Sequence, residues 1–265
     1  MFKPTTANIK KIADLPNYKK RIKELESFFD KPTIIYIDFA NVYQWNRNLH
    51  WHIDIHRLKL FLDSFKNIKL VRIYQGTLVD DEPSENFVKQ ARNLNYDVTT
   101  KDVKIMKLSI DVSSIPPNNP AVLENFIKKS LLRKLDLEQI EIMNGFLKKM
   151  NEEDIKYIEQ RKCNFDVEMG VDMNLDCERG NAENFIVWTG DSDFADPINK
   201  LIGKGKKVVI FSLSGKVTKE LSETKALIFD IRKIRDFISR RAEMKTSVRI
   251  SVKSNSIKSK EDLNN

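Results

Sequence analysis

The chain has 265 residues but only two cysteines, three histidines, eight glycines and eight prolines. So few glycines and prolines exclude a loop-dominated or low-complexity protein, and a hydrophobic content of 41% is sufficient for a sizeable core. Cys163 and Cys177 fall in one predicted helix, about 21 Å apart, which is beyond disulfide distance. Their spacing is also not that of a zinc site. We therefore expect reduced thiols in a cytoplasmic protein.

Long hydrophobic runs are also missing. No apolar stretch approaches the roughly 18 residues of a membrane-spanning helix, and the first residues lack the apolar core of a signal peptide. The sequence further lacks a Walker A loop, a GxGxxG turn and a serine nucleophile elbow. We therefore expect no membrane association, no P-loop chemistry and no serine hydrolase.

The charge balance is basic, with 46 Lys and Arg against 38 Asp and Glu and a net charge of +8. This favours a polyanionic partner, although a generally lysine-rich composition would also explain it. Residues 244–265 are rich in Ser, Lys and Asn with little periodicity, which predicts a disordered basic tail. The remaining residues 1–243 are predicted to form one domain, with a helical insertion at about 107–160.

Two apolar stretches that read as buried strands end in aspartate. Thr33–Phe39 contains Asp38, and Asn184–Thr189 is followed by Asp191 and Asp193. Capping of the next helix would explain any one of these acids. However, the carboxyl ends of parallel strands meet at one edge of a sheet, where ligands bind. We therefore expect the acids from both strands to lie together.

Strands and helices alternate on both sides of the insertion, which predicts a three-layer α/β/α fold with a mainly parallel sheet. The insertion is predicted to be helical, either as a lid or partner-binding element or as packing on the core. Its expected helices cover Ala121–Leu135, a segment beginning after Asp136, and Glu152–Arg161. The other expected helices are Tyr18–Phe29, Ile55–Phe65, Pro83–Leu94, Phe165–Arg179, Ala195–Ile202, Thr218–Lys225 and Ile234–Arg241. The other expected strands are Lys69–Tyr74, Tyr96–Thr100 extending towards Met106, Lys207–Phe211 and Leu227–Asp230.

Three ordered motifs, Ile37–Asn41, Phe165–Met173 and Thr189–Phe194, resemble those of the NYN domain. This family comprises PIN-like nucleases of the kind found in LabA-like bacterial proteins. The resemblance spans about Thr33–Phe211 apart from the insertion, which is atypical. It implies a parallel α/β/α fold and cleavage of RNA that depends on Mg²⁺ or Mn²⁺.

The resemblance also implies which residues form the site. Asp38, Asp166, Asp191 and Asp193 match the metal-site acids, and Asn41 matches a polar group of the site. Asp172 matches a further family acid, although it lies about 240° around the helix from Asp166. Carboxylates without histidine or cysteine ligands suit Mg²⁺ or Mn²⁺ rather than Zn²⁺. The sequence departs from the family at Cys163, where the family often has lysine.

Aromatic and basic residues near Asp38 predict contacts with RNA. The segment Ala40–Ile53, read as a loop, contains Tyr43, Trp45, Arg47 and Trp51, which suit stacking on unpaired bases. Packing of this loop on the protein itself is the alternative. In the insertion, Lys129 and Arg133 are expected to guide a strand towards the acids.

The leading hypothesis is a metal-dependent ribonuclease. Its alternatives are a catalytically inactive RNA- or protein-binding module of the same fold and an enzyme that acts on a small nucleotide. Single-stranded DNA stays open as a substrate, and a homo-oligomer stays open because the apolar face of the insertion must be covered by something.

Overall fold

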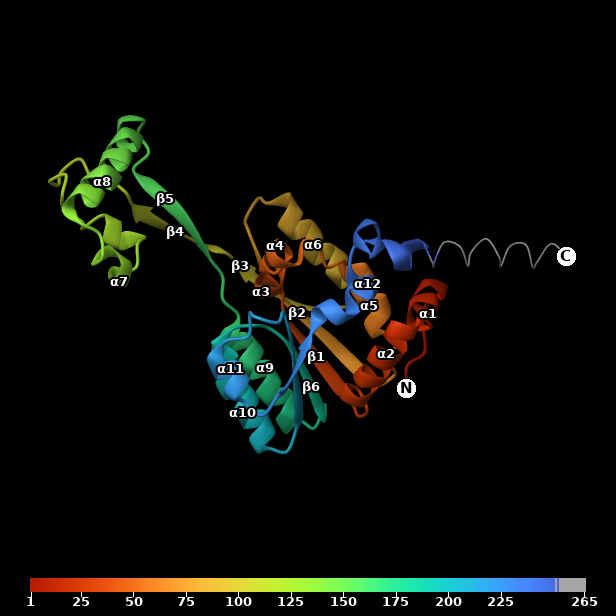
Figure 1. Cartoon of the computed structure of the whole chain (residues 1–265). Coiled ribbons are helices and arrows are strands. Elements are labelled where there is room, and N and C mark those ends of the chain that lie inside the picture. Colours follow the sequence, from red (N-terminus) through yellow and green to blue (C-terminus); the bar gives the residue numbers. More distant parts are fainter. Residues whose placement is uncertain (251, 253–265) are drawn as a thin grey trace. The chain divides into compact units, whose positions relative to one another are not determined.

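The computed structural model describes residues 1–250 and 252. The chain divides into two compact units, of which the first combines residues 1–101 with residues from 164 onwards and the second is Asp102–Cys163. The second unit contains the segment predicted as an insertion. Figure 1 shows the elements of both units, coloured along the sequence.

The first unit contains a six-stranded sheet in the order β3-β2-β1-β6-β7-β8. The four neighbouring pairs from β2 to β8 are parallel. This confirms the predicted α/β/α fold with a mainly parallel sheet. The strands are β1 (Thr33–Asp38), β2 (Ile68–Thr77), β3 (Asp97–Asp102), β6 (Asn184–Trp188), β7 (Lys207–Ser212) and β8 (Leu227–Asp230).

The two central strands are apolar along their length because helices cover both faces of the sheet. Every residue of β1 and β6 is buried. Ile35 and Ile37 belong to the large core beneath α1, α2, α5 and α12, whereas the Tyr36 hydroxyl on the opposite face donates to Asp176 of α9. Figure 1 shows α9, α10 and α11 on the face that carries Tyr36. The helices are α1 (Ala7–Ala13), α2 (Pro16–Phe28), α5 (Ile55–Leu62), α6 (Glu82–Asn93), α9 (Asp166–Glu178), α10 (Ala195–Gly203), α11 (Lys219–Glu223) and α12 (Arg235–Ile238), with 3-10 turns at Ser192–Phe194, Ile231–Ile234 and Arg241–Glu243.

The segment predicted as a long loop after β1 is instead helical. It forms α3 (Phe39–Gln44) and α4 (Asn46–Leu49). Asp38 accepts the backbone N–H of Asn41 at 3.2 Å and so caps α3. Asp38 is therefore the last residue of β1, and its carboxylate also caps α3. This fixes the start of α3 at the carboxyl edge of the sheet.

The beginning of the predicted basic tail is also ordered. Residues 246–250 are helical, and Met244 and Val248 pack in the large core. The backbone N–H of Lys245 donates to the buried carboxylate of Asp236 at 2.6 Å, which anchors this segment. The prediction of disorder is therefore wrong for residues 244–250, and its remainder at 251 and 253–265 lies outside the described residues.

The second unit is not purely helical as predicted, because it contains an antiparallel ribbon. β4 (Lys104–Ser109) pairs with β5 (Tyr157–Lys162), the latter in a segment predicted as helix. Asp154, with φ 62°, lies beyond the end of α8 (Leu137–Glu152) and turns the chain into β5. Pairing with a strand some 50 residues away thus overrides the local helical pattern.

The helix predicted over Ala121–Leu135 is broken in two. The structure contains a 3-10 turn at Leu123–Asn125 and the short helix α7 (Lys129–Leu132). Asn125 donates from its side chain to the backbone oxygen of Ser109 at 2.8 Å, a contact that holds the break in place. Leu123, Leu132 and Ile140 form the small buried core of this unit.

The cysteines do not share a helix, because α9 begins at Asp166, after Cys163. Neither forms a disulfide. Within residues 1–250 and 252, no helix combines the length and the apolar character needed to cross a membrane.

Candidate metal centre

Three of the predicted acids come together at the carboxyl edge of the sheet. Asp166, Asp191 and Asp193 each offer a carboxylate oxygen, and these atoms lie within 4.8 Å of one another. Asp191 and Asp193 follow β6, whereas Asp166 is the first residue of α9. Residues separated by some 25 positions in the chain thus converge on one point.

Asp38 lies close enough to this group to be affected by its charge. It is the last residue of β1, the strand that pairs directly with β6. Burial, reinforced by the nearby charges of Asp166 and Asp191, raises the pKa of Asp38 from its ordinary 3.8 to about 6, although the Asn41 backbone N–H opposes the shift. Asp38 is therefore a fourth acid of this edge, outside the tightest group.

Hydrogen bonds of the chain itself hold the loop after β6. The Asn41 side-chain oxygen accepts the backbone N–H of Gly190 at 3.3 Å, and Thr189 Oγ1 accepts that of Asp191 at 3.1 Å. A Cβ on Gly190 would lie 2.6 Å from the backbone oxygen of Lys216, so only glycine fits there. Asn41 therefore positions the loop that carries Asp191.

The carboxylates repel one another, and no salt bridge among the described residues offsets their charge. Burial raises the pKa of Asp166, and the neighbouring Asp193 and Asp191 raise it further, whereas the Asn164 side chain opposes the shift. Among the described residues, none of Asp38, Asp166, Asp191 and Asp193 forms a salt bridge. An oxygen-only donor set with uncompensated charge fits a divalent cation such as Mg²⁺ or Mn²⁺.

Asp172 is not part of the three-acid group. Its carboxylate accepts the Tyr74 hydroxyl at 2.7 Å and lies 3.9 Å from Arg72. The prediction of Asp172 as a metal ligand is therefore not supported by its position, because its oxygens face β2. Sequence reasoning missed these partners, although arginine and tyrosine at alternate positions of an otherwise apolar strand were a visible signal.

The sequence also gave no reason to single out Lys101. Its ammonium lies 2.5 Å from the Glu168 carboxylate and 4.6 Å from the centre of the Phe165 ring. The ion pair lowers the pKa of Glu168. It places a cation from β3 beside the first turn of α9, where Asp166 begins the helix.

The aromatic residues predicted to bind RNA divide into two groups. Trp45 and Trp51 are 3% and 2% exposed and belong to the core, so they present no face to a base, and their prediction is wrong. Tyr43, by contrast, is 64% exposed, and Arg47 is exposed as well. Composition alone could not separate the rings, because both groups lie in the same short segment.

Lys129 and Arg133 are exposed at α7 in the second unit. Nothing in the structure tests their contact with RNA, which stays a prediction.

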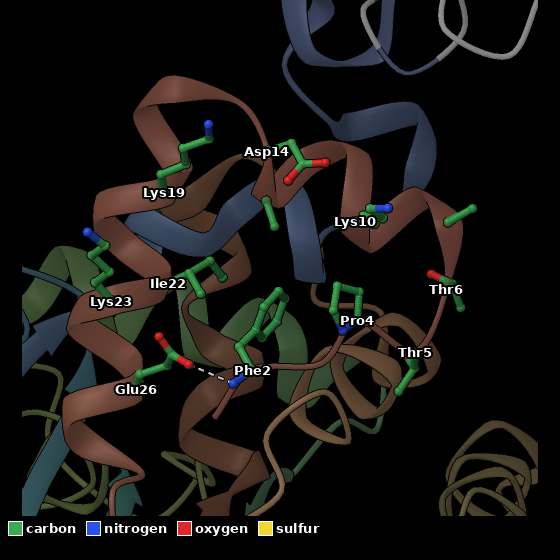
Figure 2. A pocket seen from close by; sticks show the side chains of 12 residues that line it. Phe2, Pro4, Thr5, Thr6, Lys10, Asp14, Lys19, Ile22, Lys23 and Glu26 are labelled. Atoms are coloured by element: carbon green, nitrogen blue, oxygen red, sulfur yellow. Dashed lines mark hydrogen bonds between the residues drawn. The ribbon is translucent and has the colours of Figure 1, made fainter. Parts of the chain in front are cut away.

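One cavity of the structure is lined by none of these acids. It measures about 640 Å³ and is formed where the N-terminal segment meets α1 and α2. Figure 2 shows its mixed lining, with Lys10, Lys19 and Lys23 beside Asp14 and Glu26. The backbone N–H of Phe2 donates to Glu26 at 2.7 Å. None of the site acids lines this cavity.

Asp38→Asn is expected to stabilise the metal-free protein near neutral pH. The raised pKa of Asp38 means that its stabilising contribution is present below pH 3.8 and is lost as pH rises through about 6. Above that pH the charged carboxylate costs up to about 3 kcal/mol, a cost that Asn does not carry. Thermal unfolding in chelator at pH 4 and 7.5 should show a difference at the higher pH only.

The control is Asp154→Asn, since the Asp154 side chain is 93% exposed and tolerates this change at its positive φ. It should melt like wild type at both pH values. Equal stability of Asp38→Asn and wild type at pH 7.5 would contradict the cost assigned to the buried, charged carboxylate of Asp38.

Comparison with known proteins agrees with this geometry. The family model of the NYN domain matches residues 128–231, a stretch that contains Asp166, Asp191 and Asp193. The NYN resemblance is thereby confirmed, whereas the PIN-like or LabA-like subtype stays a prediction.

No curated protein matches the chain. A crystal structure of a protein of unknown function from Vibrio parahaemolyticus is similar at 14% identity and a TM-score of 0.48, over 79% of this chain and 97% of that one.

Proposed function

We propose that this protein is a metal-dependent ribonuclease that hydrolyses phosphodiester bonds. The observation that carries the proposal is the group of Asp166, Asp191 and Asp193, whose oxygens lie within 4.8 Å of one another without a salt bridge among the described residues. The NYN family, which this chain resembles, consists of nucleases. The site's chemistry and the family therefore point to the same reaction.

Side chains of this protein would bind the cation. Asp166, Asp191 and Asp193 would bind Mg²⁺ or Mn²⁺, with Asp38 adding negative charge beside them. When bound, such an ion lowers the pKa of water and neutralises charge on a phosphate. Asn41 keeps the Gly190 turn, and with it Asp191, at the edge of the sheet.

A polymeric substrate is favoured over a small nucleotide. The net charge of +8 suits a polyanion, and exposed Tyr43 and Arg47 lie on the segment that follows Asp38. The described residues contain no phosphate-binding P-loop. We further propose that Lys129 and Arg133 contribute to strand binding from the second unit and that the protein acts in the cytoplasm.

Incubation of end-labelled single-stranded RNA and DNA with the protein tests the proposal. With Mg²⁺ or Mn²⁺ we expect RNA fragments, and with EDTA none, because the acids alone supply no electrophile. Binding to RNA without cleavage under every metal condition would instead identify an inactive RNA-binding module. Cleavage that is unaffected by EDTA would overturn the metal-site assignment.

A further inference from the structure

A second cavity lies beside α3. It has a volume of about 280 Å³ and is lined by residues of α3, α4 and α6, by residues 52–55 at the start of α5 and by Arg240. Phe39, Val42 and Asn46 line it and follow one another at intervals of three and four residues, so they share one flank of the helical segment. Asn41 lies off this flank and bonds to Gly190. The cavity thus begins one residue after Asp38.

Aromatic rings form part of the cavity wall. Phe39 and Phe87 pack with ring centres 4.3 Å apart, which fixes both rings. Tyr43 also lines the cavity but is 64% exposed, and no described residue packs a ring against it. The wall therefore combines a rigid aromatic pair with one ring that is available to a planar ligand.

The cavity also contains polar side chains, one of which has an unsatisfied atom within the described residues. The side-chain oxygen of Asn46 is buried and has no partner in the part of the chain that the structure describes. Gln90 lines the cavity from α6 with an exposed side chain, and Arg240 does so from the segment after α12. Other polar groups there are already engaged, since Asp54 caps α5 and His52 bonds to Glu243.

We propose that this cavity binds one unpaired nucleobase of an RNA strand whose backbone passes the acids. The proposal rests on the proposed function and adds a base-binding subsite to it. Tyr43 stacks on the base, the amides of Asn46 and Gln90 bond to its edge, and Arg240 pairs with the flanking phosphate.

The chemistry of the cavity favours a nucleobase over other ligands. Its volume of about 280 Å³ lies just below the range of about 300–1,000 Å³ typical of drug-sized ligands, so it suits one small planar heterocycle. A purely apolar ligand would leave the Asn46 oxygen unpaired. A phosphate alone would meet a single arginine and would make no use of Tyr43.

The test measures binding of a fluorescent RNA hexamer in EDTA, where no cleavage occurs. Tyr43→Ala should weaken binding about tenfold, since base–aromatic stacking contributes on that scale, whereas Tyr43→Phe should keep wild-type affinity because it retains the ring. Gln90→Ala should weaken binding less, about threefold, and should change the preference among homopolymeric RNAs.

An abasic hexamer provides the matched control for the ligand. Wild type and Tyr43→Ala should bind it equally, because only the backbone remains. Because the Tyr43 side chain is 64% exposed, Tyr43→Ala should leave thermal unfolding unchanged, and this measurement verifies its fold. Equal loss of affinity for intact and abasic RNA, or no loss for either, would overturn the base subsite.

Because binding is read without metal, the outcomes separate the two proposals. Cleavage with an intact affinity in Tyr43→Ala removes the subsite and leaves the nuclease. Ring-dependent binding without any cleavage leaves the subsite and removes the nuclease.

Discussion

Asp191→Asn and Asp166→Asn are each expected to reduce RNA cleavage by more than about a hundredfold. Loss of a group that merely supports a metal ligand already costs about 10- to 100-fold, so loss of a charged ligand should cost more. Asparagine keeps the shape of the side chain but removes a negative charge from the three-acid group. Binding of Mn²⁺, measured by calorimetry, should weaken in parallel.

The control for this prediction is Asp196→Asn. Asp196 is an exposed acid in the first turn of α10, three residues beyond Asp193, and lies outside the three-acid group. It should retain wild-type cleavage and Mn²⁺ affinity. If both Asp191→Asn and Asp166→Asn cleave like the control, the acids at this edge do not perform the chemistry. Thermal unfolding of all three variants separates a chemical loss from a folding defect.

The positions of Asp38, Asp191 and Asp193 could be predicted from the sequence because each follows a continuous apolar run. A run buried on both faces indicates a central parallel strand, and parallel strands end at one edge. Asp166 required the family resemblance as well. Its position depends on where α9 crosses the sheet, which no local pattern states.

What the sequence could not predict depended on distant contacts. Trp45 and Trp51 carry the same composition signal as exposed Tyr43, and only packing places them in the core. The β4–β5 ribbon joins segments some 50 residues apart, so neither segment alone indicated its partner. Helix α3 is a different case, because its cap, Asp38, is a local contact that the sequence analysis considered only as the end of a strand.

A large loss of stability is expected when contacts beneath α9 are broken, on the face of the sheet that carries Tyr36. Arg72 of β2 lies 3.2 Å from the Asp176 carboxylate, whose side chain is 3% exposed. The Tyr36 hydroxyl and the Asn181 amide each donate to Asp176 at 2.8 Å. Burial, together with the charge of Asp176, raises the pKa of Tyr36, so its hydroxyl stays protonated and continues to donate.

Arg72→Met is expected to lower the free energy of unfolding by about 3 kcal/mol or more. Removal of one partner leaves a buried carboxylate without its cation, which typically costs about 3–5 kcal/mol. Urea unfolding followed by fluorescence measures the change. The surface pair Lys89–Glu85, with side chains 69% and 49% exposed, supplies the control, because Lys89→Met breaks a contact worth about 0–1 kcal/mol.

The double variant Arg72→Met with Asp176→Asn distinguishes lost charge pairing from lost packing. Asparagine removes the unpaired charge and still accepts the Tyr36 hydroxyl, so the double variant should recover much of the lost stability. No recovery would mean that the loss comes from the arginine stem, or from its ion pairs with Asp97 and Asp172, rather than from the pair with Asp176. In either case α9 carries Asp166 at its first turn, so a helix loosened at Asp176 should also bind Mn²⁺ more weakly at temperatures where the fold persists. Unchanged Mn²⁺ affinity in a destabilised Arg72→Met would show that the first turn of α9 is held independently, by contacts such as the Lys101–Glu168 pair.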